Sequence, residues 1–496
     1  MAFTILHDSD SIGSGKIKRT YAIAMNHGIN RFVVLVAAIA GLSGFLFGFD
    51  SSVVADIHDQ VSAQLSLSTW QWSQVVSASL FGSVCGIPLS GLVADRISRR
   101  SLLKAVALLF IAGTLICADA HTLTALLAGR LLIGLCIGVA SYAAPLYIAE
   151  MAPKSKRGAL VLMNGLAITS GQAVAYLLGY FLHDASSSSW RLLLAIGILP
   201  ALVLFLGLFF IPHSPRWLIQ HHGEEKAREA LKRIRRHTTE TALELEEIKK
   251  QRSPSEANPL ALFKRPLAGL VLLGISLGIF QQFSGINAIL FYGPMIFHDA
   301  GFIPVRNAIL ATFWLSLINF IFTGVTACLI DRYGRRSLLL VGSFLACLSL
   351  LAASLFFALP HAPSPFFLLL SMTLYVIGYC ISLGSLFWVV IAEIYPSRVR
   401  GMAMSFATLM QWAANFAVSI SFLQAYERFG ESTVFLGFAL ICLTAFVVTY
   451  SFVPETSGVS LEKIEDNLAK GLNLRDIGQP LRHRDNPFDF TLEKTP

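Results

Sequence analysis

Twelve long apolar blocks dominate this 496-residue chain and leave few folds open to it. Most blocks run for roughly 18–25 residues, the length that crosses a lipid bilayer as an α-helix. Backbone groups in lipid must satisfy their own hydrogen bonds, so helices are the expected spanning element. The expected spans are 32–56, 70–93, 101–118, 122–149, 159–182, 190–211, 266–297, 306–330, 337–359, 365–394, 402–424 and 432–453.

The composition indicates an all-α membrane protein. Hydrophobic residues make up 55% of the chain and charged residues only 14%, too few charges to keep a soluble protein of this size in solution. The formal net charge of +8 does not indicate a nucleic-acid partner, because most Lys and Arg residues sit in short loops between apolar blocks. The expected surroundings are a lipid bilayer, and no obligate protein partner is expected.

The distribution of Lys and Arg sets the expected orientation. Loops after even-numbered spans are basic, whereas loops after odd-numbered spans hold few basic residues. By the positive-inside rule, the basic loops, both termini and the polar stretch after the sixth span face the cytoplasm. That stretch has the charge pattern of short amphipathic helices. The expected divisions are a cytoplasmic segment 1–31, a six-helix half 32–211, a cytoplasmic helical linker 212–265, a six-helix half 266–453 and a cytoplasmic tail 454–496.

The second half of the chain repeats landmarks of the first. The loop D-R-I-S-R-R-S-L-L at 95–103 recurs as D-R-Y-G-R-R-S-L-L at 331–339, and I-A-E at 148–150 recurs at 391–393. The members of each pair are about 240 positions apart and lie on the same side of the membrane. The sequence therefore predicts two parallel six-span halves, an arrangement that places a substrate near the bilayer midplane between them.

Four motifs stand along the chain: G-x-x-x-D-R-x-S-R-R at 91–100, P-H-S-P-R-W at 212–217, Q-Q-F-S-G-I-N at 281–287 and P-E-T-S-G at 454–458. They resemble those of sugar porters of the major facilitator superfamily, bacterial proton-coupled sugar symporters in particular, and the resemblance covers roughly residues 30–465. Ser98, His213 and Ser385 depart from the usual Gly, Glu and Pro. The resemblance implies the major facilitator fold, with twelve transmembrane helices in two six-helix halves, in the cell (inner or plasma) membrane.

Asp50 lies deep in the first apolar block, where a charged side chain costs about 2.5–3.5 kcal/mol to insert at the bilayer centre. Arg130, in the fourth block, is its natural partner. The two residues form either a fixed structural ion pair or a proton-coupling site, in which dehydration favours the neutral acid and the guanidinium favours the carboxylate. An Asp at this position resembles those of proton-coupled family members, which favours a co-transported proton.

A sugar is neutral and carries many hydroxyl groups, so its site needs neutral hydrogen-bonding side chains and an aromatic face. Amides and indoles inside apolar spans supply both, although a single amide can equally join two helices. Their positions coincide with the sugar-binding pattern of the family. The candidate substrate-binding residues are Phe47, Gln172, Gln281, Gln282, Asn287, Tyr292, Asn319, Trp388, Gln411, Trp412 and Asn415.

Acidic residues accompany the arginines of the basic loops, although acidic residues hardly affect orientation in a membrane. The resemblance implies that these charges form a cytoplasmic gate, a salt-bridge lock that holds the outward-facing state. The alternative is that they only set topology. The candidate gate residues are Asp95, Arg96, Arg99, Arg100, Glu150, Arg157, Asp331, Arg332, Arg335, Arg336, Glu393 and Arg400.

The resulting hypothesis is uptake of a monosaccharide by proton-coupled symport through alternating access. One proton entering down about 100 mV and one pH unit releases about 3.7 kcal/mol, enough for several-hundred-fold accumulation of a neutral sugar. Pentoses, hexoses and cyclic polyols all fit the sequence. The alternatives are a facilitative sugar or polyol uniporter and, more remotely, a transporter-like sugar sensor. The sequence holds no nucleophile–base set, metal-ligand cluster or nucleotide-binding loop, so neither an enzyme, a metal site nor a cofactor is expected.

Overall fold

The computed structural model describes residues 30–94, 96–153, 156–183, 188–235, 238–250, 267–359, 364–396, 399–457, 459 and 461–478. Within these ranges the regular structure is helical, and twelve helices are long and apolar enough to cross a membrane. The spans predicted from the apolar blocks agree with these helices to within a few residues. The largest differences are in the seventh span, which ends at Phe291, and the eleventh, which continues to Phe429.

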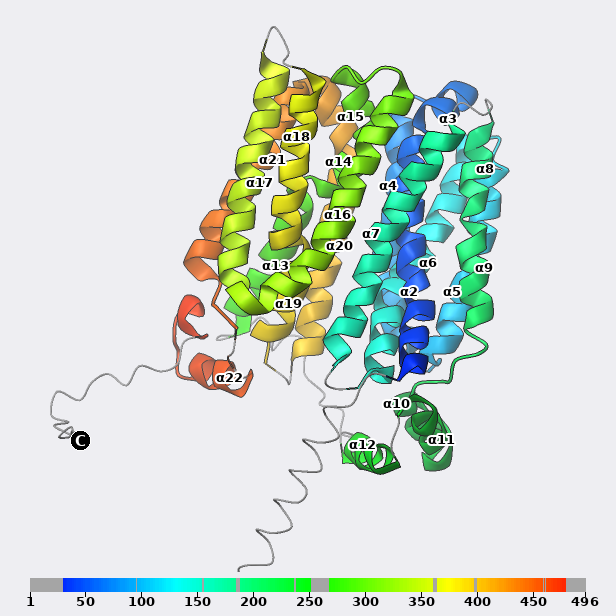
Figure 1. The fold of residues 1–496 in the computed structure, drawn as a ribbon, viewed down its shortest axis with the longest axis vertical. Helices are drawn as coiled ribbons and strands as arrows, with labels where there is room; N and C mark the ends of the chain where they lie inside the picture. The colour runs from blue at the N-terminus through cyan, green and yellow to red at the C-terminus, as the bar shows by residue number, and fades with distance from the viewer. Residues whose placement is uncertain are drawn as a thin grey trace, which may run out of the picture.

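Two bundles of spans stand side by side (Figure 1). The first comprises α2 (Arg31–Asp56), α4 (Thr69–Ala94), α5 (Arg99–Ala118), α6 (Leu123–Met151), α7 (Arg157–Leu182) and the pair α8 (Ser189–Ile196) and α9 (Ile198–Gly207). The second comprises α13 (Leu267–Phe283) with α14 (Ile286–Phe291), α16 (Val305–Tyr333), α17 (Arg335–Ala358), α18 (Pro365–Tyr379) with η3 (Cys380–Gly384) and α19 (Ser385–Ile394), α20 (Arg400–Phe429) and α21 (Glu431–Phe452).

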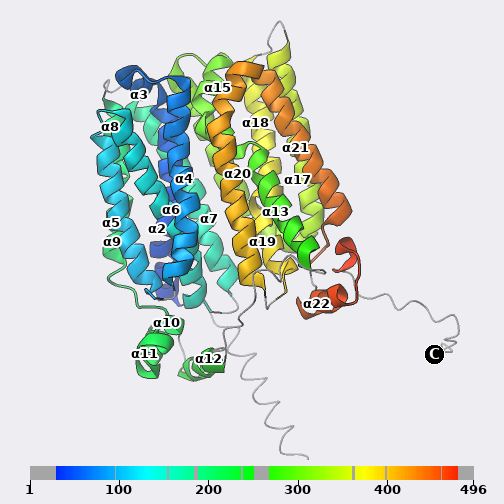
Figure 2. The same ribbon diagram turned by 180° about the vertical axis from the view of Figure 1, so that it is seen from behind.

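The two bundles meet chiefly along two helix pairs, α4 with α20 and α7 with α16. Both views agree on this arrangement, since α4 and α20 face the viewer in Figure 2 and α7 and α16 do so in Figure 1. The interface between the bundles is therefore formed by one pair of helices on each side of the molecule.

Short helices mark the two ends of the bundles (Figure 1). One end carries α10 (Pro215–His221), α11 (Glu224–Ile234), α12 (Thr238–Lys250) and α22 (Leu461–Ala469), with the short η4 (Leu474–Asp476) after it, and we call it the linker end. The opposite end, where α3 (His58–Leu65) and α15 (Gly293–Asp299) lie, is called the far end. The prediction of short helices between the two halves is confirmed for the part of the linker that the structure describes; residues 251–265 lie outside it.

Glycines let α4 and α6 approach closely in the first bundle. A Cβ atom on Gly134 would collide with the carbonyl oxygen of Ser79, and one on Gly138 would collide with that of Ser83. Small residues at such a crossing allow two membrane helices to pack backbone against backbone. This close approach positions Arg130, one turn before Gly134, between α4 and α2.

Two spans of the second bundle are interrupted within the membrane. Gly285, with a φ of 94°, separates α13 from α14 and adopts a backbone conformation that favours glycine. In the tenth span, η3 is a π-helical segment in which Ser382 has a non-helical backbone. Interrupted helices expose backbone groups inside a membrane protein only where other protein groups satisfy them, and both interruptions border the polar residues described next.

Candidate functional site

Asp50 and Arg130 form a buried ion pair between α2 and α6. The Nη1 atom of Arg130 lies 2.6 Å from Oδ1 of Asp50, and the two residues are only 2% and 5% exposed. Arg130 also donates to the carbonyl oxygen of Val75 at 3.3 Å and to Oγ of Ser79 at 2.7 Å, both on α4. Arg130, the partner predicted for Asp50, is therefore in contact with it.

One oxygen of Asp50 is left over. Oδ2 is buried and has no hydrogen-bond partner among the residues that the structure describes. Asp50 also lines a cavity of about 10 Å³, together with Phe49, Val53 and Thr114 among others, which has room for about one water molecule. A carboxyl group that has one oxygen held by a guanidinium and the other without a partner among the described residues has a place for a proton.

The predicted amides form hydrogen bonds across and within the two bundles. Gln172 on α7 accepts from Nδ2 of Asn319 on α16, at 3.3 Å, which joins the first bundle to the second. Asn287 donates to Oε1 of Gln282 at 2.7 Å across the interruption of the seventh span. Most of the predicted amides are buried, namely Gln172, Gln281, Gln282, Asn319, Gln411 and Asn415.

Gln281 links the two interrupted spans. Its Nε2 atom donates to the carbonyl oxygens of Leu383 and Gly384 at 3.0 and 2.9 Å, at the end of η3. Its own Oε1 atom and that of Gln411 are buried without a hydrogen-bond partner in the described part of the chain. Unsatisfied amide oxygens in a dry interior are ready acceptors for hydroxyl groups, since leaving them unpaired costs free energy.

The aromatic candidates take different positions. Phe47 and Trp412 meet across the interface with ring centroids 5.3 Å apart. Tyr292 donates from its hydroxyl to the carbonyl oxygen of Ser419 at 3.0 Å. Trp388 is 43% exposed and packs edge-on against its neighbour Phe387 rather than joining the amide hydrogen bonds described above.

The predicted gate charges form one ion pair within each bundle at the linker end. Arg99 at the start of α5 lies 3.5 Å from Glu150 near the end of α6. Arg335 at the start of α17 lies 2.9 Å from Glu393 near the end of α19. These two pairs occupy repeated positions, so the duplication seen in the sequence is also present in the contacts.

The other gate candidates divide into three groups. Arg100, Arg336 and Arg400 donate to backbone carbonyl oxygens near helix ends, those of Leu208, Tyr450 and Tyr395 respectively. Arg96 and Arg332 are exposed, and Nε of Arg157 is buried without a hydrogen-bond partner among the described residues. Asp95 and the side chain of Asp331 lie outside what the structure describes.

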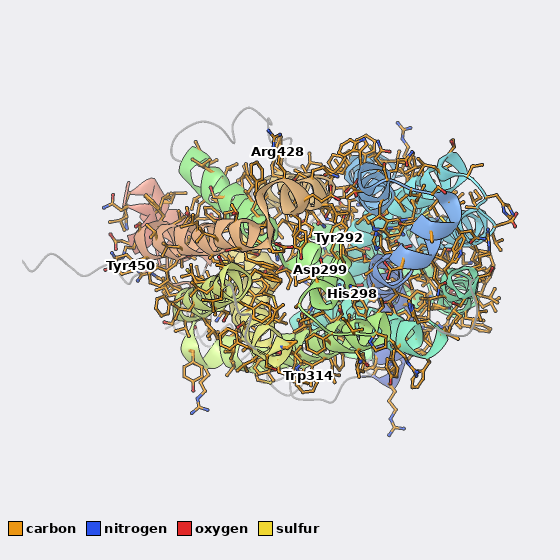
Figure 3. All side chains as sticks on the ribbon, turned by 90° about the horizontal axis from the view of Figure 1, so that it is seen from above. Tyr292, His298, Asp299, Trp314, Arg428 and Tyr450 are labelled. Carbon is orange, nitrogen blue, oxygen red and sulfur yellow. The ribbon has the colours of Figure 1, made fainter. Side chains whose placement is uncertain are left out.

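The far end is held closed by hydrogen bonds between the bundles, which the sequence did not indicate. They join α4 to α20, and α7 to α16 and α14. Seen from this end, Tyr292, His298 and Asp299 lie between the bundles, near the middle of the molecule (Figure 3). Among the described residues they include Thr69 to Glu427 at 2.6 Å, Gln424 to Ser73 at 2.9 Å, Arg306 to the Tyr180 carbonyl at 3.1 Å and Tyr176 to the Leu290 carbonyl.

Arg235, which sequence analysis also missed, fastens the linker to the first bundle. It is 7% exposed, pairs with Glu244 of α12 at 2.6 Å, and donates to the carbonyl oxygens of Met151 and Ala152 at the end of α6 at 2.8 and 3.2 Å. An arginine there satisfies carbonyl groups that a helix end leaves unpaired. Its position in a charged linker gave no signal that it would be buried.

These features define a class of protein: a membrane transporter built from two six-span bundles with polar side chains at their interface. Residues 35–468 match the family model described as "Sugar (and other) transporter". The chain belongs to this sugar transporter family of the major facilitator superfamily, and its predicted fold class is confirmed.

Similar proteins are matched over nearly their whole length. The chain is 35% identical to the galactose-proton symporter of Escherichia coli K12 over 91% of this chain and 97% of the relative. It is 35% identical to a glucose transporter of Staphylococcus epidermidis over 90% of this chain and 99% of the relative. Among solved structures, it resembles the proton:xylose symporter XylE bound to 6-bromo-6-deoxy-D-glucose, with a TM-score of 0.76, 29% identity, and coverage of 88% of this chain and 99% of the other.

Proposed function

We propose that this protein takes up a monosaccharide by proton-coupled symport through alternating access. The observation that carries the proposal is the buried pair of Asp50 and Arg130. It places a titratable carboxyl group, with one oxygen that has no partner among the described residues, inside a transporter of the sugar family. Relatives named as galactose-proton and arabinose-proton symporters support the same coupling.

The two chemical tasks fall to separate groups of residues. Asp50 binds the proton, and Arg130 competes with that proton for the carboxylate. A conformational change that moves Arg130 or admits water therefore changes the protonation of Asp50. The amides of the seventh, eighth and eleventh spans bind the sugar hydroxyls. Gln281 and Gln411 offer side-chain oxygens that have no partner in the described part of the chain. The Gln172–Asn319 bond and the Phe47–Trp412 contact join the two bundles, so sugar binding is coupled to their relative position.

The orientation follows from the basic loops. The linker end carries the repeated arginine-rich loops, so we place it in the cytoplasm, with the far end outside the cell. Segment 1–31, the linker 212–265 and the tail 454–496 are then cytoplasmic, and the halves 32–211 and 266–453 form the two membrane bundles. The protein is a multi-pass protein of the cell membrane, and it needs no cofactor besides the co-transported proton.

The test is sugar uptake by the purified protein in proteoliposomes, with a panel of pentoses, hexoses and polyols and an imposed proton gradient. Asp50→Asn should abolish accumulation against a gradient while leaving sugar exchange, because a neutral amide cannot load and release a proton. Asp119→Asn is the matched control, since the Asp119 side chain is 92% exposed and the substitution is the same.

Two outcomes would contradict the proposal. Accumulation by Asp50→Asn would mean that Asp50 does not couple the proton. Equal uptake by the unaltered protein with and without the proton gradient would identify a facilitative uniporter instead.

A further inference from the structure

A second aspartate of α2, Asp56, is buried outside the site described above. It is 5% exposed, and both of its carboxyl oxygens lack a hydrogen-bond partner in the part of the chain that the structure describes. Asp56 follows Asp50 by six residues, which places it about 9 Å further along the helix and about 120° around it. Asp56 therefore points in a different direction from Asp50, and Arg130 forms its ion pair with Asp50 and not with Asp56.

Asp56 faces α7 and a small polar cavity at the far end. A Cβ atom on Gly179 would collide with Oδ2 of Asp56, so the carboxyl group lies directly on the α7 backbone. The cavity has a volume of about 10 Å³, room for about one water molecule, and Gln60, His183 and Ser189 line it beside Asp56. Gln60 donates to the carbonyl oxygen of His183 at 2.8 Å, so the two polar lining residues from α3 and the end of α7 are bonded to each other.

No cation is bonded to Asp56 among the described residues, although titratable groups lie on the helices near it. The α8 residues that line the cavity, Ser189, Trp190 and Leu193, are neutral. The hydrogen bond from His58, together with the charges of His183 and His298, lowers the pKa of the neighbouring Asp59, so these histidines lie within electrostatic reach of this region. Tyr176 on α7 interacts electrostatically with Asp56, and His183 just after α7 lines the cavity beside it. The helices α3 and α15 also contact α2, and their titratable residues in this region are His58, Asp59, His298 and Asp299.

The segment of α7 that touches Asp56 also forms hydrogen bonds with the second bundle. Gly179 lies between Tyr176, which donates to the carbonyl oxygen of Leu290, and Tyr180, whose carbonyl oxygen accepts from Arg306 at 3.1 Å. Both bonds cross the interface at the closed far end. The charge on Asp56 therefore acts directly on the helix turn that makes these bonds.

A carboxylate without a partner is expensive to bury, and such a group is expected to be neutral instead. We propose that Asp56 is a proton-binding site of the far end, distinct from the coupling pair, and that the two bundles close at this end only when Asp56 is protonated. When the far end opens, water enters the cavity and the carboxyl group releases its proton to the same side. This proposal depends on the proposed function in one respect: it assumes that the protein works by alternating access.

The test measures the distance between spin labels on cysteines introduced at Ala63 and Arg428, exposed positions at the far end of the two bundles. It is made in the Asp50→Asn background, so that the coupling site does not contribute. The closed-to-open ratio should fall as pH rises, by at most about tenfold per pH unit, because a single proton is involved. Asp56→Asn, which mimics the protonated acid, should stay closed at every pH.

Asp59→Asn is the matched control, because the Asp59 side chain is 52% exposed and lies three residues further along the chain. It should keep the pH response. Either a pH response in Asp56→Asn equal to that of the background protein or loss of the response in Asp59→Asn would overturn the proposal.

A measurement without a change at Asp56 guards against misfolding of the variant. The infrared spectrum of the Asp50→Asn protein should show the carbonyl band of a protonated, buried carboxylic acid, which disappears on alkalinisation with the same midpoint as the distance change. Absence of such a band also overturns the proposal, whereas failure of the symport hypothesis would leave both results unchanged.

Discussion

Arg335 holds Glu393 with two nitrogen–oxygen contacts, of 2.9 and 3.2 Å, whereas its counterpart Arg99 lies 3.5 Å from Glu150. Glu393 also accepts from the hydroxyl of Thr456. A bidentate contact between guanidinium and carboxylate is stronger and more directional than a single longer one. The two repeated ion pairs, each within its own bundle, are therefore unequal in strength. The pair in the second bundle is the stronger one.

Neutralising these glutamates should open the linker end. We expect Glu393→Gln with Glu150→Gln to shift the population of molecules toward an open linker end by about tenfold, which corresponds to about 1.4 kcal/mol. Most of the shift should come from Glu393→Gln, because Glu393 makes the closer pair. Spin-label distances between the linker ends of the two bundles measure it.

Glu229→Gln is the control for this experiment, since Glu229 is an exposed residue of α11. An unchanged distance distribution in a well-folded double variant would mean that the gate charges only set topology.

The seventh span offers a second test, because Asn287 and Gln282 bond to each other at 2.7 Å across the interruption at Gly285. We expect Gln282→Ala or Asn287→Ala to weaken sugar binding by more than tenfold, since a hydrogen bond lost in a dry site costs about 1–3 kcal/mol. Calorimetric titration measures the affinity. Gln220→Ala, at an exposed amide of α10, should bind as the unaltered protein does, and unchanged affinity in both seventh-span variants would remove this span from the site.

Features that depend on the period or length of a pattern could be predicted from the sequence. The spans followed from apolar blocks long enough to cross a bilayer, because lipid imposes that length on any spanning helix. The contact of Asp50 with Arg130 followed from the cost of an isolated charge in the membrane. The roles of the other individual site residues remain predictions, although the structure brings Gln172 to Asn319 and Gln282 to Asn287.

Features that depend on packing between distant segments could not be predicted. Arg235 looks like one of many linker charges until the end of α6 presents its carbonyl oxygens to it. Asp56 lies near the expected end of a span, where an acidic residue is unremarkable in a sequence; it is notable only because α3, α7 and α8 enclose it. The π-helical segment at Ser382 also left no pattern that the sequence analysis detected.

Arg235 provides the third test. Arg235→Ala leaves Glu244 and two carbonyl oxygens at the end of α6 without their donor, so we expect a loss of about 1–3 kcal/mol in the free energy that holds α12 against the first bundle. Hydrogen exchange of the α12 backbone amides should speed up accordingly. Arg228→Ala is the control, because Arg228 is exposed on α11 and pairs within its own helix. Equal exchange in the two variants would show that Arg235 does not fasten the linker.

The last test concerns His213, which replaces the Glu that the repeat has at Glu455. Glu455 accepts from the backbone nitrogens of Arg335 and Arg336 at the start of α17, at 3.0 Å each. In the first bundle, a ring nitrogen of His213 lies 2.8 Å from Oγ of Ser98, the residue that precedes α5. The start of α17 in the second bundle therefore has an anionic cap. The equivalent position at the start of α5 in the first bundle has a histidine contact instead.

Burial, with smaller contributions from the positive charges of Arg100 and Lys104, lowers the pKa of His213 to about 4, below its ordinary value near 6.5. Between these two values the unfolded chain binds a proton that the folded protein does not, so the stability contributed by neutral His213 should fall as pH drops from about 6.5 to about 4. We expect His213→Asn to lose less thermal stability than the unaltered protein over this interval. His213→Glu should raise the melting temperature at neutral pH, because a carboxylate near a helix N-terminus contributes about 0.3–1 kcal/mol. His222→Asn, at an exposed histidine nearby, is the control; if it flattened the pH profile as much as His213→Asn, the profile would not report on His213.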